Sequence, residues 1–155
     1  MPSILTLPLF LALCLGLGFA GALVTRPALD DWYRTLRKPS WNPPNQVFGP
    51  VWTLLYCLMA VAAWRVWCRQ GDDHFPMTIF GIQLGLNFVW SGLFFGLRRP
   101  WLAFTEVVML WLAIVWTMIT FHAVDPLATT LLWPYLLWVS FASTLNFAIA
   151  TMNPR

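Results

Sequence analysis

Five long apolar runs constrain this chain more than any other feature of its sequence. Each run has at least 22 residues, whereas a helix needs about 20 to cross the roughly 30 Å of hydrocarbon in a bilayer. The runs are 4–25, 47–68, 75–97, 101–124 and 127–149. Backbone polar groups in lipid must be satisfied internally, so the runs predict helices, and period-2 alternation typical of a membrane barrel is missing. We expect one all-α domain over 1–155, a bundle of five transmembrane helices.

The composition excludes the main soluble classes. Apolar residues make up 59% of the 155 residues and charged residues 10%, against roughly 45–50% and 25% in soluble domains. A small soluble globule could not bury so much apolar surface, and a disordered chain would be far more polar. The net charge is +3, but the basic residues lie at the ends of the runs and form no stripe on a polar helix, which argues against nucleic-acid binding.

The basic residues predict an orientation instead. Two of them, Arg65 and Arg69, lie on the side of the second inter-helix loop. The other side carries seven, namely Arg26, Arg34, Arg37, Lys38, Arg98, Arg99 and Arg155. In an inner or plasma membrane this asymmetry predicts an outside N-terminus and a cytoplasmic C-terminus. We do not expect the first run to be a cleaved signal peptide, because no Lys or Arg precedes it and 22 residues is long for such a segment.

The first loop, 26–46, is long and rich in proline and aromatic residues. Long loops in compact proteins are often lids, and its prolines restrict the backbone. Asn42-Pro43-Pro44 is typical of a helix start. Two interpretations remain open: a lid over a pocket, or a tether whose aromatic side chains lie among lipid headgroups.

The third run has two different faces at 100° per residue. The small face holds Gly81, Gly85, Gly92 and Gly96, and the opposite face holds Gln83, Asn87, Trp90, Ser91 and Phe94. Gly81-xxx-Gly85 is a spacing that allows close helix packing, either within the bundle or across a homodimer. Gln83 and Asn87 should face the bundle interior, where they form interhelical hydrogen bonds or contact a ligand.

Tryptophan is unusually frequent, with 11 residues. Those at span ends fit the aromatic belt of a membrane protein. Trp52, Trp90 and Trp138 do not, because they lie inside three different runs at depths that converge below the first loop. Such a cluster suits a flat apolar ligand held by a few polar groups. The alternative is a tight aromatic core without a cavity.

Other chemistry is sparse. His74, His122 and the three cysteines lack the spacing of a metal site, and no nucleophile–base pair or phosphate loop is present. Glu106 lies inside the fourth run, where an acid can be functional. We expect it to reach the interface or to pair with Arg98 or Arg99.

Four separated motifs carry a family resemblance. They are KPSWNPP at 38–44, WTLLY at 52–56, NFVWS at 87–91 with FFG at 94–96, and PYLLW at 134–138 with Phe141-Ala142 and Leu145-Asn146. Together they span nearly the whole chain, which resembles the TspO or translocator-protein family. The resemblance implies a five-helix bundle, usually a homodimer, with the first loop covering a pocket.

The resemblance also implies ligands: porphyrins such as protoporphyrin IX and haem, and isoquinoline carboxamide drugs. The matching pocket positions are Tyr33, Pro43, Trp52, Tyr56, Asn87, Trp90, Trp138, Ala142 and Leu145. Some bacterial members promote light-dependent porphyrin breakdown, and Trp52 and Trp138 match the tryptophans assigned to it. The sterol motif of animal members is incomplete, because Phe147 stands where they have Tyr and the next basic residue is Arg155. We therefore do not expect sterol binding.

Three functions follow from these observations. The first is a membrane receptor or sensor that binds tetrapyrroles, with no obligatory cofactor. The second is an enzyme that degrades porphyrin in light, with Trp52 and Trp138 as candidate catalytic residues. The third is a transporter of tetrapyrroles or lipids, which the runs favour least because they contain no internal repeat.

Overall fold

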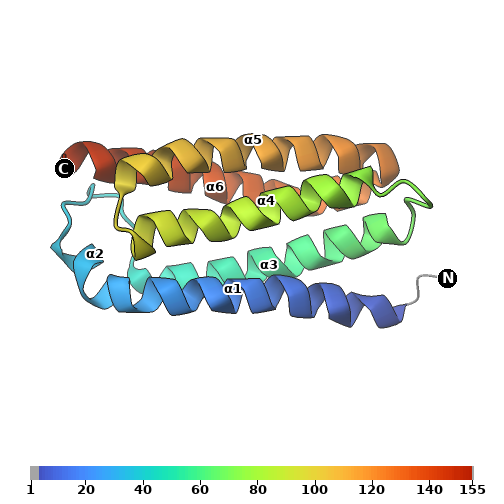
Figure 1. Ribbon diagram of the computed structural model, residues 1–155, viewed down its shortest axis with the longest axis horizontal. Helices are drawn as coiled ribbons and strands as arrows, with labels where there is room; N and C mark the ends of the chain where they lie inside the picture. Colours follow the sequence, from blue (N-terminus) through green and yellow to red (C-terminus); the bar gives the residue numbers. More distant parts are fainter. Residues whose placement is uncertain (1–3, 155) are drawn as a thin grey trace.

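The computed structural model describes residues 4–154, which form an elongated helical bundle (Figure 1). Its elements are η1 Ile4–Thr6, α1 Leu7–Asp30, α2 Trp32–Thr35, α3 Asn45–Trp67, α4 Phe75–Ser91, η2 Gly92–Gly96, α5 Pro100–Val124 and α6 Pro126–Met152. Five helices in this part of the chain are long and apolar enough to cross a membrane. The predicted all-α five-helix class is therefore confirmed, and the chain is a multi-pass integral membrane protein.

The five long helices form a ring in which each one packs mainly against two neighbours. Around the ring the order is α1, α3, α6, α5, α4 and back to α1. Because five spans are an odd number, the N-terminal end of α1 and the C-terminal end of α6 lie at opposite ends of the bundle (Figure 1). The loop between α1 and α3, the α4–α5 connection and the end of α6 share one end, which we call the loop-one end.

The first helix is longer than the sequence predicts. α1 continues past the expected end at residue 25 and stops at Asp30, although Pro27 lies inside it. Proline removes one helical hydrogen bond, but Ala28, the residue that follows it, is only 3% exposed, so packing holds this turn in place. The first loop is correspondingly shorter than the expected 26–46 and contains the short helix α2.

The third span changes its winding near the loop-one end. Gly92–Gly96 form a π-helical turn, and a wider turn of this kind shifts the face on which later residues lie. The four glycines consequently do not share one packed face. A Cβ on Gly81, Gly85 or Gly92 would meet nothing within 4 Å, whereas one on Gly96 would lie 3.3 Å from Cγ1 of Val24 in α1.

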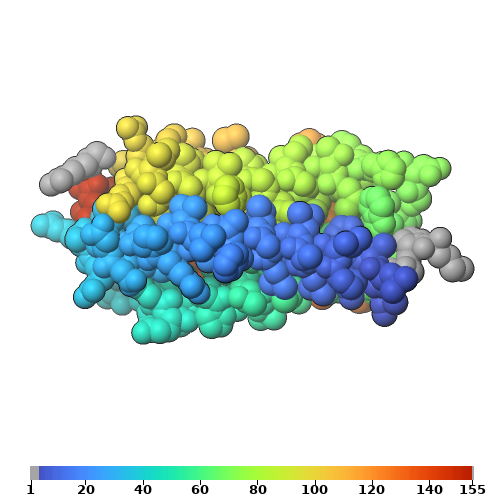
Figure 2. Space-filling view, turned by 60° about the horizontal axis from the view of Figure 1, so that its bottom comes forward, coloured from blue at the N-terminus to red at the C-terminus, as the bar shows by residue number. Residues whose placement is uncertain are grey.

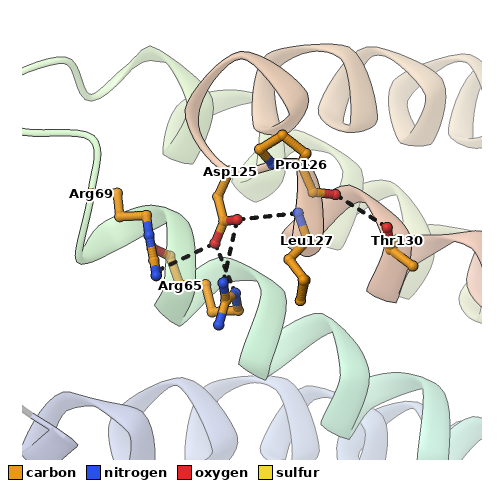
Figure 3. A network of polar contacts seen from close by, with 6 residues as sticks. All are labelled: Arg65, Arg69, Asp125, Pro126, Leu127 and Thr130. Carbon is orange, nitrogen blue, oxygen red and sulfur yellow. Dashed lines mark hydrogen bonds and ion pairs between the residues drawn. The ribbon is translucent and has the colours of Figure 1, made fainter.

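The opposite end of the bundle is held by one carboxylate (Figure 3). Asp125 accepts a hydrogen bond from Nε of Arg65 at 2.7 Å and forms an ion pair with Nη1 of Arg69 at 3.3 Å. It also caps α6 by accepting the backbone N–H of Leu127 at 3.1 Å. Burial raises the pKa of Asp125, but the Arg65 hydrogen bond, the Leu127 N–H and both guanidinium charges together hold it below its ordinary value.

Candidate ligand-binding site

An outer groove lies between α1 and α3 on the loop-one half of the bundle. Its volume is about 470 Å³, within the range of small-molecule sites. Figure 2 views this side, with α1 in blue between α4 above and the cyan start of α3 below. Its walls are Leu15, Gly18, Phe19, Gly21, Ala22, Thr25, Arg26, Leu29, Asn45, Gln46, Phe48, Gly49, Trp52, Thr53, Tyr56, Trp90, Ser91 and Phe95.

A second, much smaller space lies deeper in the bundle, which we call the inner pocket. Its volume is about 30 Å³, enough for about one water molecule. Its lining includes Tyr33 from α2 and Trp138, Ala142, Leu145 and Asn146 from α6. Four aromatic residues, Phe48, Trp52, Trp90 and Phe95, line both the groove and the inner pocket. A ligand that passes from the groove into the inner pocket must therefore displace aromatic rings.

The nine predicted pocket positions divide between these two spaces. Trp52 and Trp90 line both, and Tyr56 lines the groove. Tyr33, Trp138, Ala142 and Leu145 line the inner pocket. Pro43 and Asn87 belong to the lining of neither. Most of the predicted cluster thus lies together below the first loop, on four different elements.

The three tryptophans of the cluster are set by different contacts. The Trp52 ring lies 6.3 Å from that of Trp90 and 5.7 Å from that of Tyr56, at separations typical of favourable aromatic pairs. Trp90 donates its Nε1 hydrogen to Oδ1 of Asn146 at 3.0 Å, and Asn146 in turn donates to the Pro100 carbonyl at 2.8 Å. Trp138 packs against Phe48 and Phe141. Its buried Nε1 has no hydrogen-bond partner within residues 4–154.

Both polar atoms of the Asn87 side chain form hydrogen bonds to other helices. Its Oδ1 accepts the Tyr56 hydroxyl at 2.6 Å, and its Nδ2 donates to the Tyr135 hydroxyl at 2.7 Å. Tyr135 then donates to Oε1 of Gln83 at 2.9 Å. This series of hydrogen bonds links α3, α4 and α6. Of the two predicted roles for Gln83 and Asn87, the structure therefore shows interhelical hydrogen bonding. Tyr135 and Asn146 belong to the fifth-span motif but are not among the predicted site residues, because a lone Tyr or Asn in an apolar run does not reveal its partner.

The predicted partner of Glu106 is wrong. Arg98 instead pairs with Asp31 at 3.2 Å. Glu106 is 7% exposed, and neither of its carboxyl oxygens has a hydrogen-bond partner in the described part of the chain. The side chain enters the bundle because its turn of α5 places it beside Ala103 and Val107, which are buried as well.

The first loop packs closely against the bundle. Tyr33 is 3% exposed and its hydroxyl donates to Oδ1 of Asn42 at 2.9 Å. Lys38 donates to the Tyr33 carbonyl at 2.7 Å and lies 4.7 Å above the Tyr33 ring. Burial raises the pKa of Tyr33, an effect opposed by the Asn42 hydrogen bond, and burial lowers the pKa of Lys38. The Trp41 ring lies 5.7 Å from that of Phe141, another wall of the inner pocket.

Two backbone contacts tie this loop to the end of α6, and we call them the Asn153 clasp. The Arg37 N–H donates to Oδ1 of Asn153 at 3.0 Å, and Nδ2 of Asn153 donates to the Arg37 carbonyl at 2.9 Å. The same Nδ2 also donates to the Ile149 carbonyl at 2.8 Å. One side chain therefore ends α6 and fixes the loop that covers the inner pocket.

Comparison with known proteins decides the family. A model of the TspO/MBR family matches residues 10–152. The chain belongs to the TspO/MBR family. Tryptophan-rich protein TspO of Chlorobaculum tepidum is 46% identical over 98% of both chains. The tryptophan-rich sensory protein of Cereibacter sphaeroides is 40% identical over 93% of this chain and 89% of its own. Human translocator protein is 38% identical over 76% of this chain and 72% of its own. The resemblance predicted from the four motifs is confirmed.

In this TspO/MBR member, both spaces are lined mainly by aromatic and apolar side chains. Within residues 4–154, no three His, Cys, Asp or Glu side chains gather as a metal site would require. The groove instead combines ring faces with a few hydroxyl, amide and guanidinium groups. That combination suits reversible binding of a flat, mostly apolar molecule.

Proposed function

We propose that this protein is a membrane receptor or sensor that binds tetrapyrroles such as protoporphyrin IX or haem. The observation that carries the proposal is the groove of about 470 Å³ walled by Trp52, Tyr56 and Trp90. Flat aromatic walls favour a flat ligand, because offset ring stacking adds to the energy of apolar burial. The inner pocket of about 30 Å³ is too small for such a ligand, so the first contact is with the groove.

The contacts at the loop-one end favour a receptor over a transporter. The first loop covers the inner pocket and is tied down by the Asn153 clasp. A ligand held in the groove that presses on Phe48 and Trp52 shifts rings that also form the wall of the inner pocket. Binding is thereby coupled to the packing beneath the loop, as a sensor requires.

The test is a titration with protoporphyrin IX in detergent or nanodiscs, followed by the porphyrin absorbance. A Trp52→Phe, Trp90→Phe double variant should weaken binding, because both indole rings line the groove. The matched control is Trp116→Phe with Trp133→Phe, since both of these side chains are half exposed on the bundle surface. Unchanged affinity in the first variant, or an equal loss in the control, contradicts the proposed site.

A second candidate function, light-dependent porphyrin breakdown, is favoured by the position of Trp52. Its ring lies within 6.4 Å of those of Tyr56, Trp90 and Tyr135, so a radical formed at Trp52 has oxidisable neighbours. Illumination of the porphyrin complex in air should then bleach the porphyrin faster with wild-type protein than with Trp52→Phe at equal occupancy. Equal bleaching with and without protein excludes this function.

A further inference from the structure

The groove is polar at one end and apolar at the other. Along α1 its wall runs from Leu15 to Leu29, a length of about 21 Å at 1.5 Å per residue. Leu15, Gly18 and Phe19 form the deep end. Arg26 stands near the loop-one end, where the groove also meets Asn45 and Gln46 at the start of α3.

Arg26 is the one charged residue among the eighteen that line the groove. Its side chain is exposed and forms no ion pair or hydrogen bond with the described residues. Asp30, one helical turn further on, stays beyond ion-pair distance, and Asp31 is paired with Arg98. The guanidinium of Arg26 is therefore available to an anion in the groove.

The start of α3 adds to the positive potential at this end. Pro44 is the N-cap and supplies no capping side chain. The backbone N–H groups of Asn45 and Gln46 belong to the first helical turn, which has no intrahelical acceptors, and the helix dipole favours negative charge there. Arg26 and the α3 start thus lie on opposite walls of one mouth.

We propose that this mouth binds a carboxylate of the ligand, with Arg26 as the specificity-determining residue. This inference rests on the proposed function and adds the chemical class: a flat apolar molecule with an ionised carboxylate at one edge. Its apolar body lies in the deep part of the groove, and its carboxylate lies at the interface. A carboxylated flat ring fits better than a phospholipid, because the rigid faces of Trp52, Tyr56 and Trp90 match a rigid plane and not a flexible chain.

The test compares protoporphyrin IX, which has two carboxylates, with its dimethyl ester, which has none. Wild-type protein in phosphatidylcholine nanodiscs should bind the acid at least about tenfold more tightly than the ester. This ratio corresponds to the free energy that one charge-assisted hydrogen bond usually contributes. Arg26→Gln should remove this preference by weakening binding of the acid far more than binding of the ester. Arg26→Lys should restore part of it. Added salt should weaken binding of the acid more than that of the ester.

The matched control is Arg34→Gln, which removes one exposed positive charge from the same end of the bundle but outside the groove. It should keep the preference for the acid. Equal loss in both variants would show a general charge effect and overturn the assignment to Arg26.

Three further outcomes separate this inference from its alternatives. If acid and ester bind equally well and Arg26→Gln changes neither, the carboxylate site is wrong while porphyrin binding stands. If neither porphyrin binds, the proposed function itself fails. If nanodiscs with phosphatidylglycerol abolish the acid preference of the wild-type protein, the mouth takes a lipid phosphate and the proposed ligand class is wrong.

Discussion

At the scale of single residues, Tyr56 connects three helices of the site. Its hydroxyl donates to Asn87 in α4, its ring contacts Trp52, and the same ring lies on the backbone of α1 at Gly18. Tyr56 was predicted as a ligand contact from a family motif alone. Its partners could not be predicted, since helical periodicity gives the face of a residue but not the residue it meets on another helix.

Gly18→Ala tests the contact between α1 and Tyr56. A Cβ at this position would lie 2.6 Å from Cδ2 and Cε2 of the Tyr56 ring, so the ring must move and its bond to Asn87 must weaken. We expect a loss of about 1–3 kcal/mol in the free energy of unfolding, as for other overpacked sites, with weaker porphyrin binding. Denaturation in detergent measures the first effect.

Gly16→Ala is the matched control, because a Cβ there would meet nothing within 4 Å. It should leave stability unchanged or slightly higher, since alanine favours the helix. Equal destabilisation by both substitutions would mean that α1 does not approach Tyr56 as closely as the structure shows.

At the scale of elements, the spans were predictable and their contacts were not. Hydropathy predicts five helices because lipid leaves the backbone no other solution. The extension of α1 past Pro27 depends on the burial of Ala28, and the π-helical turn at Gly92–Gly96 has no periodic signature. A regular 100° step places Gly81, Gly85 and Gly96 on one face, but only Gly96 of the three lies close to α1, at Val24.

The Asn153 clasp should control how readily the first loop opens. Asn153→Ala removes both bonds to the Arg37 backbone, so the loop should open more often and expose its chain to protease. We expect faster tryptic cleavage after Arg34 and Arg37 and faster porphyrin release. Thr151→Ala is the control, because its hydroxyl bonds only to the Ala148 carbonyl of its own helix. Cleavage at the wild-type rate in Asn153→Ala would rule out the clasp.

Asp125, at the start of α6, should make the stability of the protein depend on pH. The pKa of Asp125 is lower in the folded protein than its ordinary value near 3.8. Its contribution to stability is therefore complete at neutral pH and is lost as the pH falls through the folded pKa. Asp125→Asn keeps a capping side chain but loses the charge, so it should be less stable at pH 7 by about 1–3 kcal/mol. The gap should close below about pH 4. Unfolding at several pH values measures both, and a constant gap would contradict the role of the charge.

At the scale of the whole molecule, the ring of helices leaves two features facing lipid. One is the groove between α1 and α3. The other is the surface of α4 at Gly81 and Gly85, where exposed Ile82 and Val89 lie nearby. The cyclic helix order is the reason that α1 and α3 form the groove wall, and it could not be predicted, because hydropathy contains no information on which spans are neighbours.

The predicted homodimer can be tested on the α4 surface. Gly81 and Gly85 leave open space for a second helix, and close backbone approach drives helix association in lipid. Gly85→Leu fills this space and should lower the dimer fraction, measured by energy transfer between labelled protomers in dilute detergent or lipid. Gly16→Leu, at an equally open glycine on α1, should not change it. A dimer that persists in Gly85→Leu assembles through another face.

The Asn153 clasp also has a consequence for biosynthesis. Arg37 and Asn153 are 116 residues apart, and a ribosome adds about 5–20 residues per second. Roughly 6–23 s therefore pass between the synthesis of the first loop and that of the side chain that secures it. A chain that stalls before its final helix therefore lacks both Asn153 and the α6 wall of the inner pocket, so the pocket and the fastening of its loop are completed together at the end of synthesis.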